Sequence, residues 1–343
     1  MRQLRGTLYI MTENSYLSLD GENIVVNQEG KEVSRRPLHN LQSIVTFAYP
    51  GASPALLGKC AEMGIAFTFC TPKGQFLARS VGKSNGNVLL RRTQYRIADD
   101  EFESCKIAKH MIFGKIYNCR QRIERIRRDH AMRVNERALT SASSFLKSML
   151  PMVESETNLD ALRGLEGVAA NSYFGIFDEM ILNGKELFRF KSRNRRPPLD
   201  PVNALLSMAY SALTRDCASA LETAGLDSYV GFLHRDRPGR VSLSLDLMEE
   251  LRPCIADRFV LYCINNRMFN TSDFDFKDSG AVFLKDDARR KFYKEWSEMK
   301  REDLHHPYHG EKLQWGMVAF AQAQLLSRYL RGDIDAYPPF LYK

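Results

Sequence analysis

The sequence predicts an α+β protein with a β-rich N-terminal domain and a larger, all-α C-terminal domain. Three observations lead to this prediction. Short strand-like runs fill the chain up to about residue 80, and segments with apolar residues at helical spacing fill it from about residue 99. The length of 343 residues also exceeds that of a usual single domain. We therefore expect a first domain at 1–80, a linker at 81–98 and a second domain at 99–343.

The first domain is expected to contain a series of short strands and one helix. Asp20-Gly21 is a turn signal between two of the strands, and Pro54 begins a helix over 54–63 because proline is tolerated in a first helical turn. The Gly and Asn residues of 81–92 are typical of a linker with room for one short strand. The expected strands read, in order, TLYI, SYLSLD, NIVVNQ, SIVTFA, AFTFC and FLARS.

The second domain is expected to consist of long helices. The first, over 99–132, starts with acidic residues and repeats apolar residues at a helical period. Its basic second half also contains Glu124 and Asp129, and these acids favour a solvated helix over a phosphate-binding track. The stretch NTSDFDFKDSG is expected to be a loop and YPPFLYK an irregular tail. Further helices are expected at 159–183, 201–224, 244–268, 287–301 and 311–330.

Composition excludes several classes of protein. Hydrophobic residues make up 44% and charged residues 26%, which is typical of a globular chain and not of a disordered one. No signal peptide and no run of about 18 apolar residues is present, so we expect a cytoplasmic protein without a membrane partner. The seven cysteines are scattered without a C-x-x-C pair, which argues against disulfides and thiolate zinc. The net charge of +8 favours a polyanionic partner.

Positive charge is densest in the segment FRFKSRNRRPPLDP. Five cations within eight residues repel one another, and the following Pro197-Pro198 favours an extended, exposed chain. Such a segment is more plausible opposite a phosphodiester backbone than as an unpaired surface feature. The candidate DNA-binding residues here are Arg189, Lys191, Arg193, Arg195 and Arg196.

A helix over 244–259 would separate apolar from acidic residues. At about 100° per residue, one side holds Leu247, Met248, Leu251 and Ile255, and the other holds Asp246, Glu249, Glu250 and Asp257. Local statistics favour carboxylates that face water. The alternative is that these carboxylates bind a divalent cation, since such an ion would offset the repulsion among three carboxylates within one turn. The Gly- and Pro-containing stretch 235–243 would let His234 fold back over the start of this helix.

Glu166 is a further candidate because it lies among small and apolar residues. A buried carboxylate needs a partner. For Glu166 the partner could be a metal ion, but an ion pair with Arg163 or a charge near a helix N-terminus are alternatives. Glu166, His234 and Glu249, with Asp246 alongside, form an oxygen and nitrogen set that suits Mg²⁺ or Mn²⁺. Beside a basic surface this set favours phosphodiester chemistry. Spacing alone does not select these residues uniquely.

Three ordered motifs resemble those of a known family. They are LRGLEGVAANSYF, RNRRPPLDPVNALLSMAYSAL and GLDSYVGFLHRDRPGRVSLSLDLMEELRPCIADRFV. Together they resemble the CRISPR-associated integrase, the larger protein of the spacer-acquisition pair, and the length suggests its type I-C form. The resemblance implies a homodimer formed by the β-domain, a metal-binding catalytic helical domain and a small ferredoxin-like partner protein.

The same resemblance assigns roles to the site residues. It implies that Glu166, His234 and Glu249 hold the metal and are catalytic, and that Asp246 supports the metal site. Glu250 lies on the same acidic face and stays open as the third ligand. The implied reaction is attack by the 3′-hydroxyl of a prespacer DNA on the CRISPR repeat boundary, with metal-dependent DNA cleavage in related members.

Three further arginines, Arg235, Arg237 and Arg240, flank His234 and are candidate phosphate contacts near the metal. The competing interpretation is a non-catalytic DNA-binding scaffold whose acids serve only structure. A zinc site in LHHPYHG is disfavoured, because Pro307 would break the helix that such a spacing uses.

Overall fold

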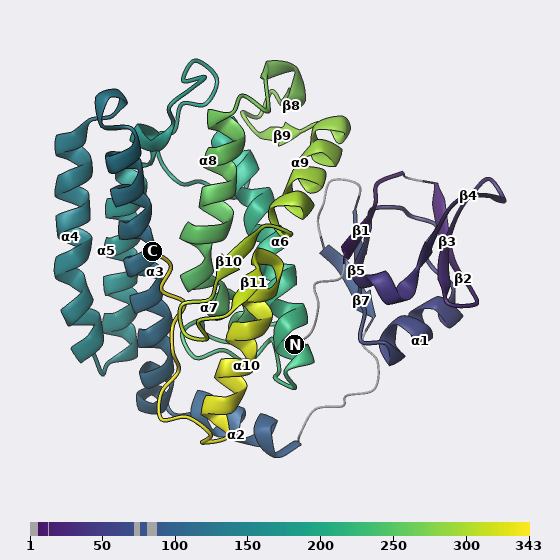
Figure 1. Cartoon of the computed structure of the whole chain (residues 1–343), viewed down its shortest axis with the longest axis horizontal. Helices are drawn as coiled ribbons and strands as arrows, with labels where there is room; N and C mark the ends of the chain where they lie inside the picture. Colours follow the sequence, from purple (N-terminus) through teal and green to yellow (C-terminus); the bar gives the residue numbers. More distant parts are fainter. Residues whose placement is uncertain (1–5, 13, 72–75, 81–87) are drawn as a thin grey trace. The chain divides into compact units, whose positions relative to one another are not determined.

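The structure, a computed structural model, describes residues 6–12, 14–71, 76–80 and 88–343. The chain divides into two compact units (Figure 1). The first unit comprises Met1–Asn85 together with Arg290–Arg301, and the second comprises Gly86–Arg289 together with Glu302–Lys343.

The first unit is the predicted β-rich region. A four-stranded sheet has the order β1-β5-β6-β7, in which β1, β5 and β6 are parallel and β7 is antiparallel to β6. A second sheet is the antiparallel meander β2-β3-β4. The bounds are β1 Gly6–Ile10, β2 Ser15–Asp20, β3 Asn23–Gln28, β4 Lys31–Pro37, β5 Leu41–Thr46, β6 Ala66–Cys70 and β7 Phe76–Ser80, with α1 at Pro54–Glu62 and a 3₁₀ turn at Leu38–Asn40.

All the expected strands form, and β4 is an additional strand. Strand β4 is largely exposed and reads KEVSRRP, so it lacks the apolar alternation by which strands are recognised. Leu17, Ile44 and Phe67 lie in the buried core between the elements of this unit, and Leu56 brings α1 onto it. Ser53 caps α1 by accepting a hydrogen bond from the Leu56 amide.

One helix expected in the second domain contributes to the first unit. Helix α9, Asp286–Met299, supplies Tyr293, whose ring stacks on that of Tyr9 with centroids 4.5 Å apart. Phe47 also contacts Tyr293, at 5.4 Å between centroids. Aromatic contacts between residues so distant in sequence leave no local signal, which explains why chain order alone assigned this segment to the other domain.

The second unit is mainly helical. It also contains two short hairpins, so the expectation of an all-α domain needs this correction. Its helices are α2 Val88–Ala98, α3 Glu101–Asp129, α4 Glu136–Ser155, α5 Leu159–Gly175, α6 Pro201–Thr223, α7 Ser242–Leu251, a π-helix Arg252–Asp257, α8 Arg258–Asn265 and α10 Val318–Leu330. The hairpins pair β8 Phe274–Phe276 with β9 Val282–Leu284 and β10 Asp303–His305 with β11 Lys312–Gln314, and 3₁₀ turns lie at Ala131–Arg133, Phe177–Met180, Thr271–Asp273 and Trp315–Met317.

Helices α2 and α4 also differ from the expectation. Helix α2 lies within the stretch expected as a linker, whose residues 81–87 lie outside the described residues. It is fixed by Gln94, whose buried amide donates to the carbonyls of Asp227 and Val230 at 2.8 Å each. Helix α4 was not predicted, since Ser and Thr residues and Pro151 dilute its apolar pattern, but it buries Leu146 and other apolar residues.

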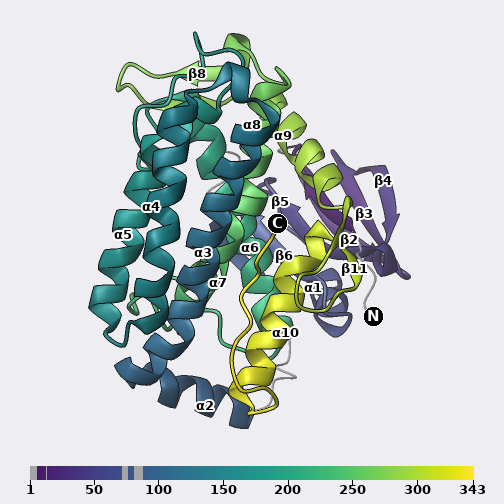
Figure 2. The same ribbon diagram turned by 60° about the vertical axis from the view of Figure 1, so that its left-hand side comes forward.

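Helices α3, α4 and α5 lie side by side in both views of the ribbon (Figures 1 and 2). The helix predicted over 244–268 is instead α7, the π-helix and α8 in succession. Its acidic side does not face water, because Asp246, Glu249, Glu250 and Asp257 are all at most 2% exposed. The expectation of a solvated acidic face is therefore wrong. No helix in the described part of the chain is long and apolar enough to cross a membrane.

Candidate active site

The carboxylates of Glu166 and Glu249 are bridged by a lysine. Lys115 projects from α3, and its Nζ lies 2.7 Å from Glu249 Oε2 of α7 and also contacts Glu166 Oε1 of α5. The Lys115 side chain is only 7% exposed. Burial alone would lower the pKa of Lys115, but Glu249 and Glu166 raise it above its ordinary value. Three helices thus converge on one buried cluster of charges, which we call the acid–histidine cluster: Lys115, Glu166, His234, Asp246, Glu249 and Arg252.

Glu249 is the most strongly paired acid of the acid–histidine cluster. Arg252, at the start of the π-helix, places Nη1 2.7 Å from Glu249 Oε1, and Lys115 pairs with the other oxygen. Burial raises the pKa of Glu249, but Arg252 and Lys115 outweigh it and bring the pKa to about 2. Glu249 is therefore ionised at neutral pH, as a metal ligand must be.

His234 is fixed by Asp246. The Asp246 carboxylate accepts hydrogen bonds from the backbone amides of Phe232, Leu233 and His234 at 2.6, 2.9 and 3.0 Å. Its Oδ1 also lies 2.5 Å from His234 Nδ1. Because this carboxylate acts as an acceptor, Nδ1 carries a ring hydrogen, so Nε2 is the ring nitrogen through which the neutral imidazole could bind a metal. His234 Nε2 lies 3.9 Å from Glu249 Oε1, so the loop returns the histidine to the helix as the sequence suggested.

The tight loop depends on Gly231. A Cβ at this position would lie 2.7 Å from Asp246 Oδ2 and 2.9 Å from the Ser242 backbone. No real side chain tolerates contacts that short, so the glycine of GFLH is required for the loop to reach Asp246.

Glu250 belongs to a different network. Its Oε2 accepts the Phe340 amide at 2.8 Å, and its Oε1 accepts Gln322 Nε2 at 3.0 Å and the hydroxyl of Tyr337. Burial raises the pKa of Glu250 to about 7, in spite of these donors. Asn118 of α3 completes the anchoring of the C-terminal segment, residues 331–343, by donating to the carbonyls of Glu250 and Phe340 at 2.7 Å each.

The three acids left open by the sequence therefore lie in different surroundings. Asp246 contacts the loop before α7, Glu250 contacts α10 and the C-terminal segment, and Glu249 contacts Lys115, Arg252 and the Nε2 side of His234. The alternative pairing of Glu166 with Arg163 does not form. Arg163 pairs with Asp160 at 2.5 Å and donates to the Leu233 carbonyl.

The donor set fits a divalent metal, although the side chains as they lie are not arranged around one. Within the described residues, no three His, Cys, Asp or Glu side chains approach closely enough to hold an ion. Lys115 lies between the two glutamates and neutralises them. Two carboxylates and an imidazole with a free Nε2, oriented by a carboxylate on Nδ1, are nevertheless the donors and the support that metal-binding histidines use.

The predicted DNA-binding residues fall into two groups. Arg189, Lys191, Arg195, Arg196 and Arg237 are exposed, Arg240 is half-buried, and the described residues include no acidic partner for them. Arg193 differs, because its Nη1 donates to Asn203 Oδ1 at 2.7 Å and its guanidinium lies over the Tyr210 ring. Arg235 pairs with Asp160, with Nη2 at 3.0 Å from Oδ1.

Sequence reasoning missed Lys115 and Arg252. Lys115 is flanked by apolar residues in IFGKIY, and a buried lysine in such a context signals an acidic partner. Arg252 follows Glu249 by three residues, which is the spacing of a helical ion pair. In the segment LHHPYHG, His306 is buried and its Nε2 lies 3.1 Å from Gln322 Oε1.

The fold and the site define a class: an α+β protein whose helical unit buries an acid–histidine cluster beside exposed basic segments. Residues 8–298 match the profile of the family described as CRISPR associated protein Cas1. The chain is 45% identical to "CRISPR-associated endonuclease Cas1 1" of Chlorobaculum tepidum, and the match covers the full length of both chains. It is also 45% identical, over the whole of both chains, to "CRISPR-associated endonuclease Cas1 2" of Rhodospirillum rubrum. The chain belongs to the Cas1 family.

Solved structures share the fold. A chain described as "Casposase bound to integration product" superimposes with a TM-score of 0.84 at 21% identity, covering 98% of this chain and 94% of that one. A Cas1 protein from Thermotoga maritima does so with a TM-score of 0.80 at 22% identity, covering 98% and 99%. The predicted α+β class and the resemblance to the CRISPR-associated integrase family are confirmed. The type I-C form stays a prediction.

Proposed function

We propose that this chain is a divalent-metal-dependent DNA endonuclease and integrase that inserts short DNA spacers into a CRISPR array. Membership in the Cas1 family supports the nuclease and integrase class. The observation that carries the metal dependence is the pairing of His234 with Asp246, which turns the free Nε2 of the imidazole toward Glu249. Metal-binding histidines almost always have such a partner on the ring nitrogen that does not bind the ion.

Glu166, His234 and Glu249 would hold Mg²⁺ or Mn²⁺, which would polarise a phosphoryl oxygen and orient the attacking hydroxyl. Asp246 keeps the His234 ring in one tautomer and orientation. Arg252 keeps Glu249 ionised, and Lys115 neutralises both glutamates before the ion binds. No protein nucleophile is needed, because a DNA 3′-hydroxyl or water attacks the phosphorus.

Exposed arginines and lysine would bind the DNA backbone. Lys191 is one of the exposed residues in the basic segment 189–196, and Arg237 is one of those in the loop that follows His234. Guanidinium groups without acidic partners are suited to phosphate oxygens. The DNA would comprise the prespacer and the CRISPR repeat.

The remaining parts of the proposal concern assembly and place. The β-rich domain, 1–80, would form a homodimer, and the helical domain, 99–343, would hold the metal. The small ferredoxin-like partner is supported by a fold neighbour described as "Cas6-RT-Cas1--Cas2 complex", with a TM-score of 0.78 and 22% identity over 98% of this chain and 36% of that one. We place the reaction in the cytoplasm.

A strand-transfer assay tests the proposal. The substrate is a supercoiled plasmid with a CRISPR repeat, with a labelled prespacer and with or without the partner protein. We expect Glu166→Gln, His234→Ala and Glu249→Gln to abolish transfer while DNA binding persists, and Glu186→Gln, an exposed acid, to leave both unchanged. EDTA should abolish transfer and Mn²⁺ or Mg²⁺ should restore it. Transfer by all three variants, or indifference to EDTA, would overturn the assigned metal site, whereas DNA binding without any transfer by the wild-type protein would favour the DNA-binding scaffold.

A further inference from the structure

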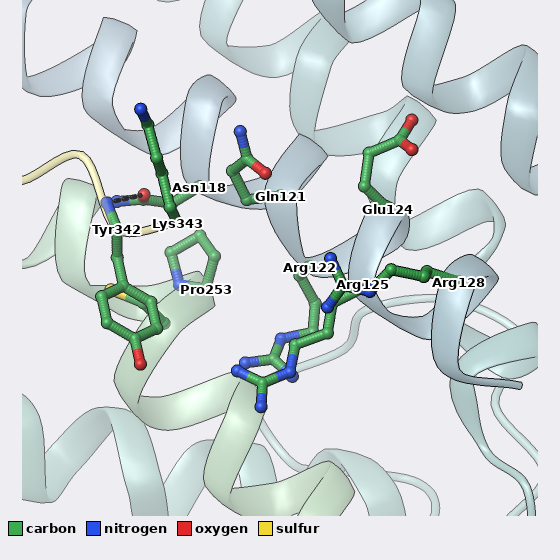
Figure 3. A pocket seen from close by; sticks show the side chains of 10 residues that line it. Asn118, Gln121, Arg122, Glu124, Arg125, Arg128, Pro253, Tyr342 and Lys343 are labelled. Carbon is green, nitrogen blue, oxygen red and sulfur yellow. Dashed lines mark hydrogen bonds between the residues drawn. The ribbon is translucent and has the colours of Figure 1, made fainter.

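A pocket lies in the second unit at the C-terminal half of α3 (Figure 3). Arg122 and Arg125 of α3 line one side, Pro253 and Cys254 of the π-helix line another, and Tyr342 closes it. The hollow measures about 70 Å³, enough for a few water-sized groups. None of these residues belongs to the acid–histidine cluster.

Arg122 is a half-buried cation without an acidic partner among the described residues. Its Nε is buried and makes no hydrogen bond, and within the described residues the guanidinium forms no ion pair. Burial lowers the pKa of Arg122, and the nearby Arg258 and Arg125 lower it further. Arg258 is itself engaged, with Nη2 3.2 Å from Glu302 Oε2 and its guanidinium over the Trp315 ring. Arg122 therefore carries a partly desolvated charge that has no ion-pair partner among the described residues.

Arg125 brings a second charge to the same place. Figure 3 shows the guanidinium groups of Arg122 and Arg125 side by side, with the ring of Tyr342 across from them. Arg125 approaches an acid through its Nε, at 3.6 Å from Asp129 Oδ2, and half of the side chain is exposed. The Glu124 carboxylate points away in this view, and it is bonded to Arg127 at 2.7 Å. Two guanidinium groups thus face a hollow whose lining acid, Glu124, is already paired with Arg127.

Such an arrangement costs free energy unless an anion binds. Like charges repel, and the repulsion is weakly screened where water is excluded. A tetrahedral oxyanion relieves it best, because two planar guanidinium groups can each donate to a pair of its oxygens. We propose that Arg122 and Arg125 bind one phosphate group of a nucleic-acid strand, at a subsite separate from the acid–histidine cluster.

The choice of a nucleic acid as the source of the phosphate rests on the proposed function. Arg122 follows Lys115 by seven residues on α3, so the subsite lies about 10 Å along the helix from the cluster. It would therefore hold a phosphate other than the one that reacts. The sequence favoured a basic half of α3 that is only solvated, because Glu124 and Asp129 lie among its arginines. The proposal revises that expectation for the part of α3 that lines the pocket.

The salt dependence of DNA binding tests the proposal. A labelled single-stranded oligonucleotide is titrated with Arg122→Gln, Arg125→Gln and the double variant in EDTA, so that no chemistry occurs. Each lost phosphate contact should reduce the slope of log K against log salt by about 0.7. We expect the double variant to bind about tenfold more weakly, with a slope smaller by roughly 0.7 because both arginines hold one phosphate. Arg137→Gln on α4, an exposed arginine outside the pocket, is the matched control.

Inorganic phosphate tests whether the pocket itself is the site. Phosphate should raise the Tm of the wild type and of Arg137→Gln but not of the double variant. Arg122→Gln should not lower the Tm in phosphate-free buffer, because it removes an unpaired charge. An equal phosphate effect in all proteins, or a destabilised Arg122→Gln that keeps the phosphate effect, would overturn the proposal.

The two sources of phosphate are distinguished by the two assays together. The double variant could lose the effect of phosphate on Tm and still bind DNA with the same slope of log K against log salt as Arg137→Gln. That result would show that the ligand of the pocket is not a nucleic acid. Failure of the proposed function would appear separately, as strand transfer by the Glu166→Gln variant, since the binding assays need neither metal nor chemistry.

Discussion

Asp246 holds His234 at two levels, because one carboxylate binds both the imidazole and the backbone that carries it. The ring Nδ1 lies 2.5 Å from Asp246 Oδ1, and the His234 amide donates to the same oxygen at 3.0 Å. A change at Asp246 must therefore move the position of the histidine as well as the orientation of its ring.

Asp246→Asn should weaken metal binding without removing a direct ligand. The amide nitrogen of asparagine cannot accept a hydrogen bond, so some of the loop amides and the ring lose their acceptor. We expect Mn²⁺ affinity to fall 10- to 100-fold and the free energy of unfolding to fall by about 2 kcal/mol. Calorimetric titration with Mn²⁺ and urea unfolding measure these effects. Asp236→Asn, in the exposed part of the same loop, is the control. Unchanged Mn²⁺ affinity in Asp246→Asn would contradict this role.

Gly231→Ala should disturb the same loop by steric overlap. The new methyl group would lie 2.7 Å from Asp246 Oδ2, so the carboxylate or the loop must shift. We expect a loss of stability of about 1–3 kcal/mol together with weaker Mn²⁺ binding. Gly58→Ala in α1, where a Cβ meets no atom within 4 Å, controls for the substitution itself. If both variants unfold at the same urea concentration, the close approach at Gly231 has no energetic consequence.

Lys115→Met should destabilise the protein without metal and strengthen its response to metal. Without the ammonium group, Glu166 loses its buried partner and Glu249 keeps only Arg252. We expect the free energy of unfolding to fall by about 3 kcal/mol in EDTA. Mn²⁺ should raise the Tm more in this variant than in the wild type, because the ion no longer competes with a lysine. Lys147→Met, an exposed lysine of α4, serves as the comparison. A smaller Mn²⁺ effect in Lys115→Met would show that the lysine assists metal binding.

Asp257 should make stability depend on pH. Burial raises its pKa to about 6, from an ordinary value of 3.8, although Tyr210 donates to its Oδ1 at 2.7 Å. Between these values the folded state binds more protons than the unfolded state, so stability falls as pH rises from about 4 to about 6. The fall amounts to roughly 3 kcal/mol for a shift of about two units.

Asp257→Asn removes the titrating group, so its curve of stability against pH should be flatter over this window. Urea unfolding at several pH values gives the difference in free energy of unfolding between the wild type and Asp257→Asn. This difference separates the effect of Asp257 from that of Glu250, whose pKa is also raised. Parallel curves would contradict the prediction.

The strands, most of the helices and the return of His234 to its helix were predictable because they depend on local patterns. Alternation marks strands, a period of 3.6 marks helices, and Pro and Gly mark the turn before α7. Ordered motifs identified the family. The helix α4 escaped because its apolar positions are diluted by serine, threonine and Pro151.

The surroundings of α7 could not be predicted from the sequence. A helical projection separates apolar from acidic residues, but it does not show what meets the acidic side. Lys115 precedes Glu249 by more than one hundred residues, and Gln322 follows Glu250 by 72. Both acids are buried through contacts of that kind. The π-helix was not predicted either, because its residues Arg252–Asp257 were read as part of one continuous helix.

The anchoring of the C-terminal segment to Glu250 has a practical consequence for handling the protein. Phe340 and Tyr337 bind Glu250, the residue next to Glu249, so trimming the chain before Tyr337 would remove these contacts from α7. Limited proteolysis at this end should therefore impair the acid–histidine cluster from a distance. A purification tag is better separated from Lys343 by a flexible spacer than joined to it directly.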